Sequence, residues 1–409
     1  MNPTKRVRIL LTVPHLNRTA HPYRAMMAIA KHLCREEFDL SICSLRNSGH
    51  EETGPILDRL GIPWFVTVFR SRNRSLCEMK VVYDAQKEIQ RRGPFDIQHS
   101  LDFTSNPIEA IGARLCSRRY VYSQANLNYN GHPFFLRMKF RSSNRIVAIA
   151  NHVREFLFEQ GAPPSKVVTI FNGIDLEEAD RELSGTTSAP GNTILVVGQI
   201  EPRKRHQDVI KAMPIILKRH PQVRLAVAGS VYHPDYLSDL RQLAAELGVQ
   251  DRVDFLGGRK DVFELMRQSR ALVLCSESEG LPWVILEAMT ARLPCVGSDI
   301  EAHREVIENG RTGLLSPLGD PAGYAAALDR LLSDPQLAAR LAFQARTTVE
   351  RDYSAVVMVR QTERMYREMM VSIRPVVTRA TISAAIAVHA RKEHPNDYSR
   401  HWPTKVSSP

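Results

Sequence analysis

The sequence predicts an α/β protein made of two Rossmann-like domains, each built on a doubly wound parallel sheet. At 409 residues the chain is longer than one hydrophobic core usually serves, so two domains are expected. Short apolar runs alternate with helical stretches, and most of these runs are continuously apolar, as in parallel strands buried on both faces. Repeated βα units imply right-handed crossovers, which place helices on both sides of each sheet.

The apolar runs predict twelve strands. Those of the first half are Val7–Val13, Phe38–Cys43, Trp64–Val68, Asp96–His99, Tyr120–Ser123, Ile146–Ala150 and Val167–Phe171. Those of the second half are Ile194–Gly198, Leu225–Gly229, Val253–Gly257, Ala271–Cys275 and Cys295–Ser298. Residues 183–193 are rich in Ser, Thr, Gly and Pro and interrupt the alternation, which indicates a loop near the entry to the second domain.

The predicted organisation has four parts. Residues 1–171 form the first domain and residues 172–350 the second, with the join at Asn172–Asp175. Residues 351–370 form a helix that crosses back to the first domain, and this helix and the join are the expected hinges of a domain closure. Residues 371–409 form a basic, partly disordered tail, in which "VTRATISAAIAVHARKEH" has the pattern of a short amphipathic helix.

Composition and cysteine usage indicate a cytosolic globular protein. The sequence has no run of 18 apolar residues, so a transmembrane helix is not expected. The apolar stretch Ile9–Val13 follows basic residues as in a signal peptide, but it is short and no small-residue cleavage site follows, which favours a buried strand. Six scattered cysteines without a CxxC pair are expected to be reduced.

Positive charge gathers in the first half. Residues 1–171 hold 25 Lys and Arg against 14 Asp and Glu, whereas residues 172–370 hold 24 against 28. This asymmetry concerns partners rather than fold, and it suits an anionic membrane surface or an acidic substrate; a solvated basic face is the alternative. Nucleic acid is not expected, because the sequence has no zinc-finger spacing, no RNP motif and no aromatic residues among its basic runs.

Loops that follow strands of the second half carry ligand-binding chemistry, because ligands of doubly wound domains bind at the carboxyl ends of strands. Arg203, Lys204 and Arg205 follow one strand just before a helix. Such cations suit a diphosphate, since the side chains and the helix dipole act with the same sign. Alone, this motif is equally typical of a solvated basic helix start.

Two glutamates flank a Gly-Leu-Pro turn in "CSESEGLPWVILEAM". Glu279 precedes the turn and Glu287 lies more than a helical turn beyond it, so one ligand atom cannot meet both. Ionised carboxylates accept hydrogen bonds, which suits hydroxyl clusters at the two ends of a nucleotide sugar. Helix capping by Glu279 and a surface position for Glu287 are the structural alternatives. A third loop holds Gly258 and Arg259, which suit a flat ring, although this signal is weak alone.

The chain resembles the retaining GT-B glycosyltransferases of family four. The motif that carries the resemblance is P-S-x-x-E-G-F-G-x-x-x-x-E-A-M, present here as "CSESEGLPWVILEAM"; "FLGGRKD", "NGID" and "ENGRTGLLSP" match further family segments. The resemblance covers nearly all of residues 5–370. It implies two Rossmann-like domains that face a central cleft, with the nucleotide sugar on the second domain and the acceptor on the first.

The resemblance also implies residue roles. Glu279 holds hydroxyls of the transferred sugar, Glu287 holds the ribose, and Lys204 contacts the diphosphate and stabilises the leaving nucleotide. Lys204 and Glu279 are therefore the expected catalytic residues. The expected donor-binding residues are Gln199, Arg203, Gly258, Arg259, Gly280, Leu281, Trp283 and Glu287, of which Gly280, Leu281 and Trp283 offer backbone amides, while Pro282 has none to give.

Several positions depart from the family pattern. The usual arginine of the first donor loop is Gln199, and the usual glycine after the lysine is Arg205. The usual histidine of the first domain is missing from "VYSQANLN". The loop "VPHLNRTAHPYR" lacks the usual glycine pair and is polar and cationic, which fits an acidic acceptor. The expected acceptor-binding residues are His15, Asn17, Arg18, His99 and Gln124, although a histidine at a strand end is more often structural.

The sequence therefore predicts a retaining, metal-independent hexosyltransferase without a cofactor, because no D-x-D motif is present to hold a metal-bound diphosphate. Its expected partners are a UDP- or GDP-linked sugar and a polysaccharide, lipopolysaccharide-core or lipid-linked acceptor. It is expected in the cytoplasm, with peripheral attachment to the inner face of the membrane. A noncatalytic glycan- or partner-binding member of the fold and a nucleotide-sugar epimerase are the alternatives, and Asp102 is the one hint of the latter. A phosphorylase is disfavoured, because no lysine is marked to bind pyridoxal phosphate.

Overall fold

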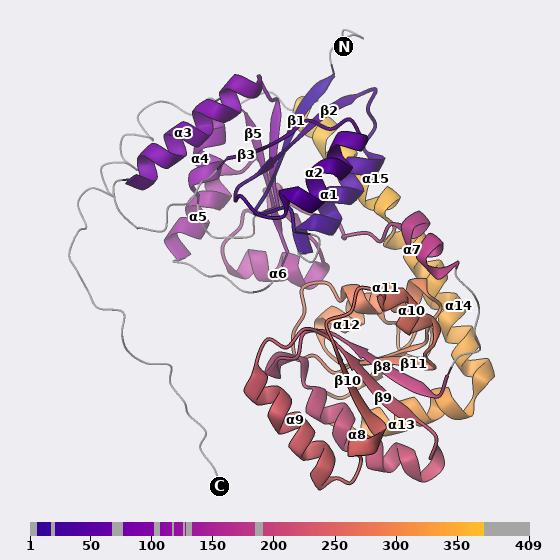
Figure 1. Cartoon of the computed structure of the whole chain (residues 1–409). Coiled ribbons are helices and arrows are strands. Elements are labelled where there is room, and N and C mark those ends of the chain that lie inside the picture. Colours follow the sequence, from indigo (N-terminus) through magenta and orange to yellow (C-terminus); the bar gives the residue numbers. More distant parts are fainter. Residues whose placement is uncertain are drawn as a thin grey trace. The chain divides into compact units, whose positions relative to one another are not determined.

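The computed structural model of the chain describes residues 6–17, 21–67, 77–101, 107–116, 118–125, 127, 133–184 and 191–371. Two sheets organise these residues (Figure 1). The first has seven strands in the order β3-β2-β1-β4-β5-β6-β7, and the second has six in the order β10-β9-β8-β11-β12-β13. All strand pairings within the two sheets of the described residues are parallel, so the predicted fold class, two Rossmann-like parallel-sheet domains, is confirmed.

The first sheet and its helices follow one another in strict alternation. In chain order they are β1 (Val7–Val13), α1 (His21–His32), β2 (Phe38–Ser44), α2 (His50–Arg59), β3 (Trp64–Val66), α3 (Cys77–Arg92), β4 (Ile97–Ser100), α4 (Ile108–Leu115), β5 (Arg119–Gln124), α5 (Pro133–Ser142), β6 (Arg145–Ala148), α6 (Asn151–Glu159), the 3-10 helix η1 (Pro164–Lys166) and β7 (Val167–Thr169). Figure 1 shows α3, α4 and α5 on one side of this sheet and α1 and α2 on the other.

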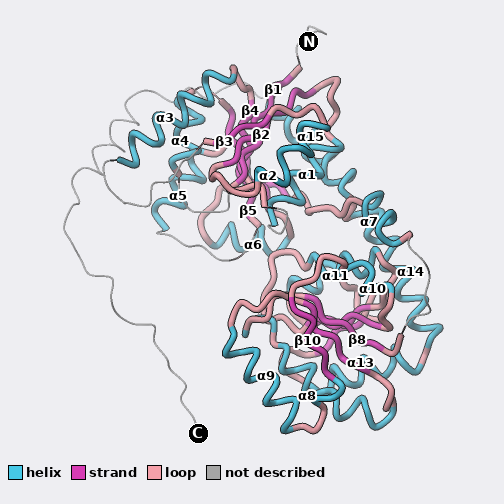
Figure 2. The backbone as a smooth tube through the Cα atoms, in the orientation of Figure 1, coloured by secondary structure: helices cyan, strands magenta, loops and turns pink. Residues whose placement is uncertain are grey.

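Helix α7 (Leu176–Leu183) leads to the second sheet. The elements that follow are β8 (Thr193–Val197), η2 (Pro202–Lys204), α8 (His206–Arg219), β9 (Arg224–Ala228), α9 (Pro234–Glu246), η3 (Gln250–Arg252), β10 (Val253–Gly257), α10 (Val262–Arg267), β11 (Ala271–Leu274), α11 (Trp283–Thr290), β12 (Cys295–Ser298), α12 (Glu301–Val306), β13 (Leu314–Ser316), α13 (Pro321–Ser333), α14 (Pro335–Asp352) and α15 (Ala355–Val371). The tube in Figure 2 shows this succession of strands and helices.

The second sheet is buried on both faces, as its continuously apolar strands predict. In β8, Ile194 and Val196 pack with the apolar side chains of α8, α9 and α13. Their neighbours Leu195 and Val197 pack with α10 and α11 on the opposite face. Successive side chains of a strand point to opposite faces, so a strand covered on both sides needs apolar residues at every position.

All twelve predicted strands are present among the described residues, which also contain a thirteenth that was not predicted. Strand β13 has only three residues and pairs with β12 at the edge of the second sheet, where Val296 is in register with Leu314. A run this short carries no periodicity of its own, because its order comes from the neighbouring strand. The N-terminal run Val7–Val13 is β1, which confirms the strand interpretation.

The join between the halves is held by backbone contacts with the segment that precedes α15. The Ile174 N–H donates to Tyr353 O over 2.7 Å, and the Ala355 N–H donates to Ile174 O over 2.8 Å. A Cβ on Gly173 would lie 2.3 Å from Ser354 O, so the glycine of "NGID" is explained by this close approach.

Helix α15 packs on the first sheet and its connecting turns. Tyr366 OH lies 2.6 Å from Nδ1 of His99 on β4, and Glu363 accepts a 2.8 Å hydrogen bond from the Cys34 N–H. Of the six cysteines, the structure gives Cys34, Cys43, Cys116, Cys275 and Cys295 as free thiols; the side chain of Cys77 lies outside the described residues. The predicted tail from 372 onward also lies outside them.

Candidate active site

Two loops of the second sheet bring Lys204 and Glu279 together. Lys204 ends η2, which follows β8, and Glu279 lies in the loop that follows β11. Strands β8 and β11 are parallel neighbours, so the loops that leave them meet at one edge of the sheet. The Lys204 Nζ lies 2.5 Å from Glu279 Oε1, and the side chains are 12% and 10% exposed. A backbone hydrogen bond of 3.0 Å from the Glu277 N–H to Arg203 O joins the same loops.

Arg203 also holds the loop that follows β11, residues 275–282, which we call the acidic loop. Its Nη1 donates to Ser278 O over 2.6 Å and lies 3.7 Å from Glu279 Oε2, while its Nη2 lies 2.5 Å from Glu201 Oε1. Glu279 therefore faces two cations. Burial by itself raises the pKa of this carboxyl, but the charge and hydrogen bond of Lys204, with Ser276 and Arg203, hold the pKa below its usual value. Glu279 is thus ionised at neutral pH and accepts hydrogen bonds from hydroxyl groups.

The backbone conformation at Arg205 explains why the family pattern has glycine at this position after the lysine. Its backbone has φ 49° and ψ 43°, a left-handed conformation that glycine adopts without strain. The Arg205 side chain forms an ion pair with the buried Asp208, with Nε 2.7 Å from Oδ2. We attribute the tolerance of arginine at this position to that ion pair, which offsets the backbone cost. Gln199, in place of the family's arginine, is exposed.

Glu287 is buried in α11 and pairs with Arg24, to which no sequence motif assigned a role. Its Oε1 lies 2.5 Å from Nη1 of Arg24 on α1, and the Glu287 side chain is 7% exposed. Burial raises the pKa of Glu287, and the charge and hydrogen bond of Arg24 only partly offset this effect. The Arg24 guanidinium also lies 5.2 Å from the ring centroid of Trp283, one helical turn before Glu287.

The predicted anion site of three backbone amides needs a correction. The Trp283 N–H donates to Leu281 O over 2.9 Å, so it is used within the turn and does not face an anion. Trp283 and Leu281 are also buried, at 6% and 3% exposure, whereas Gly280 is half-buried. Pro282 shapes this turn as the N-cap of α11. Spacing alone missed the internal hydrogen bond, because it depends on the turn's backbone angles.

The loop predicted for the nucleobase is exposed. Gly257 has φ 67°, a left-handed conformation, and Gly258 is exposed beside Ser230 Oγ, which lies 2.8 Å from the place of a Cβ. Arg259 pairs with Asp261, with Nε 2.8 Å from Oδ1. Its guanidinium is therefore paired within the loop itself.

The predicted acceptor residues do not form one cluster. Asn17 is exposed and His15 half-buried, whereas Arg18 lies outside the described residues. His99 is 3% exposed, with Nε2 2.7 Å from Ser123 Oγ and its other ring nitrogen beside Tyr366.

Burial lowers the pKa of His99 to about 3, which leaves it neutral. Gln124 is fully buried and accepts a hydrogen bond from Tyr122 OH. The structure thus favours packing roles for His99 and Gln124, since a side chain enclosed by its own sheet does not reach a ligand.

Two further residues, which no sequence motif marked, lie at the start of α6: His152 contacts the loop of Glu279, and both contact Glu305 on α12. His152 Nε2 lies 3.2 Å from the backbone oxygen of Glu279, and its Nδ1 lies 3.5 Å from Glu305 Oε2. Asn151 donates from Nδ2 to Glu305 Oε1 over 2.5 Å. No local pattern marks these residues, because the contacts join segments more than 100 positions apart.

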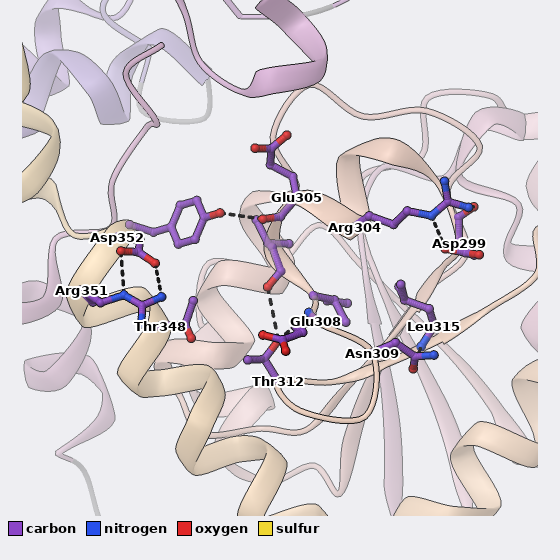
Figure 3. Close-up of a pocket in the computed structure, with 13 residues that line it drawn as sticks. Asp299, Arg304, Glu305, Glu308, Asn309, Thr312, Leu315, Thr348, Arg351 and Asp352 are labelled. Atoms are coloured by element: carbon purple, nitrogen blue, oxygen red, sulfur yellow. Dashed lines mark hydrogen bonds and ion pairs between the residues drawn. The ribbon is translucent and has the colours of Figure 1, made fainter.

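A separate hollow of about 620 Å³ lies on the second half, lined by α12, the turn after it and the end of α14 (Figure 3). Figure 3 shows Arg304 turned toward Asp299 and Arg351 turned toward Asp352, and the arginine-to-acid contacts are 2.6 Å in both pairs. Both guanidinium groups that line the hollow are thus neutralised by neighbours. The hollow contains none of the predicted donor-binding residues.

The described residues include no group of three or more His, Cys, Asp or Glu side chains arranged to hold a metal ion. Within the same part of the chain, every helix is too short or too polar to span a bilayer.

Comparison with known proteins matches both halves of the chain. Residues 184–348 match the family model described as Glycosyl transferases group 1, and residues 24–178 match that described as Glycosyltransferase Family 4. A phosphatidyl-myo-inositol mannosyltransferase of Mycolicibacterium smegmatis is 28% identical over 76% of this chain and 84% of its own length. An N-acetyl-alpha-D-glucosaminyl L-malate synthase of Bacillus anthracis is 28% identical over 58% of this chain, and the alignment spans 62% of that enzyme, less than two thirds.

Solved structures share the fold. Anabaena HepE in complex with UDP and glucose superposes with a TM-score of 0.73 at 20% identity, covering 88% of this chain and 99% of HepE. A glycosyltransferase of Rickettsia africae has a TM-score of 0.77 at 19% identity, covering 90% of this chain and all of its own. With the two family models on successive halves and this shared architecture, the chain belongs to the GT-B glycosyltransferases of family four.

Proposed function

We propose that this protein transfers a hexose from a nucleoside diphosphate sugar to a glycan or lipid-linked acceptor, with retention of the anomeric configuration and without a metal ion. The observation that carries the proposal is the contact of 2.5 Å between Lys204 and the ionised Glu279 at the strand ends of the second sheet. One group is a cation for a phosphate and the other an acceptor for sugar hydroxyls. A nucleoside diphosphate hexose needs a cation for its phosphates beside an acceptor for its hydroxyls.

In the proposed reaction, Lys204 moves little. Its ammonium group stands where negative charge grows on the departing diphosphate, and a charge already in place costs no reorganisation when the bond breaks. Arg203 keeps the acidic loop beside it through the 2.6 Å hydrogen bond to Ser278 O. Glu279 accepts hydrogen bonds from hydroxyls of the transferred sugar, and Glu287 accepts those of the ribose.

Retention is proposed to follow from attack of the acceptor hydroxyl on the face that the diphosphate leaves. The bond from the anomeric carbon to the diphosphate oxygen breaks, the bond to the acceptor oxygen forms, and the acceptor's proton passes to the departing diphosphate. This route needs no pair of carboxylates on opposite sides of the anomeric carbon, as a glycosidase does. The two glutamates then bind different parts of the donor, in agreement with their separation by eight positions along the chain.

Binding of the donor nucleotide can be tested without knowing the acceptor. Calorimetry of the full chain with the uridine, guanosine, adenosine and thymidine diphosphates in EDTA is expected to show selective micromolar binding of one of them. Glu287→Ala is expected to weaken that binding at least tenfold. Glu301→Ala, an exposed glutamate on α12, is the matched control and is expected to bind as the wild type does. Binding that appears only with added Mg²⁺ would contradict metal independence.

A noncatalytic binding protein is the second candidate, and one observation favours it: Gln199 stands exposed where the family has an arginine. Slow donor hydrolysis separates the two. The transferase is expected to release nucleoside diphosphate and hexose from the selected donor sugar, with the α-anomer appearing first by proton NMR from an α-linked donor. Tight donor binding with no release under any condition would support the noncatalytic protein, and a first-formed β-anomer would overturn retention.

The acceptor is proposed to lie at an anionic membrane surface. The first half carries the positive charge, and each basic group near such a surface contributes about 1 kcal/mol. Co-sedimentation with phosphatidylglycerol vesicles but not with phosphatidylcholine vesicles is the expected result at low salt. Equal sedimentation with both, or with neither, would leave the acceptor as a small soluble molecule.

A further inference from the structure

Arg24 and Glu287 form the contact from which a further role can be inferred. The described residues up to Arg367 belong to one compact unit, which includes both partners. Arg24 Nη1 lies 2.5 Å from Glu287 Oε1, but the two side chains differ in exposure, at 45% for the arginine and 7% for the glutamate. The carboxylate is thus enclosed by α11, while the guanidinium approaches it from the solvent side.

The chemistry of this contact matches that of the ligand proposed for Glu287. A ribose presents two neighbouring hydroxyl donors to a carboxylate, and a guanidinium presents N–H donors in a fixed fork. The two donor sets satisfy the same acceptor oxygens and therefore exclude each other. We propose that Arg24 is an internal occupant of the ribose site on Glu287, which the nucleotide must displace in order to bind.

The surroundings allow the arginine to leave at little cost. A half-exposed guanidinium regains water when it leaves, so an ion pair of this kind contributes modestly. Its other neighbour is the Trp283 ring at 5.2 Å, which offers attraction without a directional bond. Arg24 therefore sets the affinity for the nucleotide without making its binding impossible, and it does so through the ribose. This inference rests on the proposed role of Glu287 as the ribose ligand.

The test compares two nucleotides that differ only in the ribose hydroxyls. UDP and 2′,3′-dideoxy-UDP, or the guanosine pair if the wild type selects GDP, are titrated into the full chain at pH 8. Arg24→Met keeps the apolar contact with Trp283 and removes every N–H donor. It is expected to bind the ribose nucleotide about threefold more tightly than the wild type does, as loss of a partly exposed ion pair implies. The dideoxy nucleotide is expected to bind both proteins equally.

A second ion pair on α1 supplies the matched control. Lys31 Nζ lies 2.9 Å from Asp175 Oδ2, so Lys31→Met breaks a contact of the same helix without touching Glu287. It is expected to leave both affinities unchanged, and Arg24→Lys is expected to lie between the wild type and Arg24→Met. Unchanged or weaker UDP binding by Arg24→Met overturns the proposal. So does equal tightening for both nucleotides, or for Lys31→Met.

Two outcomes distinguish failure of this inference from failure of the proposed function. If Glu287→Ala binds UDP as the wild type does, Glu287 is not the ribose ligand and both proposals about it fail. If Glu287→Ala weakens UDP but Arg24→Met changes nothing, the donor site stands and the displacement by Arg24 is refuted.

Discussion

Lys204 and Glu279 form an ion pair of 2.5 Å although 75 positions separate them. The pair exists because β8 and β11 are parallel neighbours whose exits meet at one edge of the second sheet. A hydrogen bond from the Arg203 guanidinium to Ser278 O joins the same two loops. The site therefore resides in two loops that the sheet brings together, and its function is tested best by substitutions that change one charge at a time.

Lys204→Met is expected to abolish most of the catalysis while the protein still folds. Removing a preorganised group that stabilises charge in a transition state typically costs about 100- to 1,000-fold in kcat. Release of nucleoside diphosphate from the selected donor sugar measures the effect. Lys211→Met, at an exposed position of α8, is the control and is expected to match the wild type. Activity of Lys204→Met within threefold of the wild type would show that the diphosphate is neutralised elsewhere.

Glu279→Gln and Glu287→Gln are expected to change stability in opposite directions at pH 7. The pKa of Glu279 is held below its usual value, so ionised Glu279 stabilises the fold at any pH above the unfolded pKa of 4.5. Its replacement leaves Lys204 without a charged partner and is expected to cost on the order of 3 kcal/mol. The pKa of Glu287 is raised instead, so its ionisation destabilises the fold as pH rises through 4.5, and the neutral glutamine removes that cost.

Thermal melts at pH 7 and pH 5 test the predicted direction of each stability change. Glu287→Gln is expected to melt about 1–3 °C above the wild type at pH 7, with a smaller gain at pH 5, because more of the wild-type carboxyl is then protonated. Glu279→Gln is expected to melt below the wild type at both values. A Glu287→Gln protein that melts below the wild type would mean that the bond to Arg24 outweighs the burial of the charge.

The buried histidine of β4 is expected to make the protein sensitive to acid. The pKa of His99 is lowered to about 3, so the folded protein binds fewer protons than the unfolded one below pH 6.5. The free energy of unfolding therefore falls as the pH drops from 6.5 toward 3. His99→Gln is expected to reduce this slope by up to about 1.4 kcal/mol per pH unit.

Urea unfolding at pH 7, 6 and 5 measures the slope. His233→Gln, at an exposed position just before α9, is the control and is expected to keep the wild-type slope. His206 and His303 are also buried with pKa values lowered to about 4, so part of the acid sensitivity is expected to remain in His99→Gln. An unchanged slope in His99→Gln would show that the acid sensitivity comes from other groups.

Gly229→Ala is expected to disturb the lysine loop without touching a charge. A Cβ at Gly229 would lie 1.7 Å from Gly198 O, at the point where the chain leaves β8 toward Lys204. Relief requires a backbone shift, which is expected to destabilise the protein and to lower donor affinity together. Gly248→Ala is the control: Gly248 has open space around it, and its φ of 66° costs about 1 kcal/mol, with donor affinity retained. Equal donor affinity in Gly229→Ala and the wild type would contradict the prediction.

The sequence alone determined the two-sheet architecture and the loops that carry the site. Strands buried on both faces need apolar residues at every position, so twelve of the thirteen strands in the described part of the chain were visible as apolar runs. Strand β13 was missed because its three residues take their order from pairing with β12. Parallel strands deliver their following loops to one edge, so the sequence placed Lys204 and Glu279 in loops at the strand ends of the second sheet, and the structure shows that the two side chains meet.

Tertiary packing decided what each side chain faces. Arg24 pairs with Glu287 across more than 200 positions, His152 reaches Glu279 O from α6, and His99 and Gln124 are enclosed by the first sheet. Local patterns report which face of a strand or helix is apolar, because that property repeats every two or about 3.6 residues. Local patterns do not indicate which distant charged side chain contacts a given loop. That depends on how whole elements pack, and in this protein packing buries Glu287 beside Arg24, which excludes the surface position left open as the alternative.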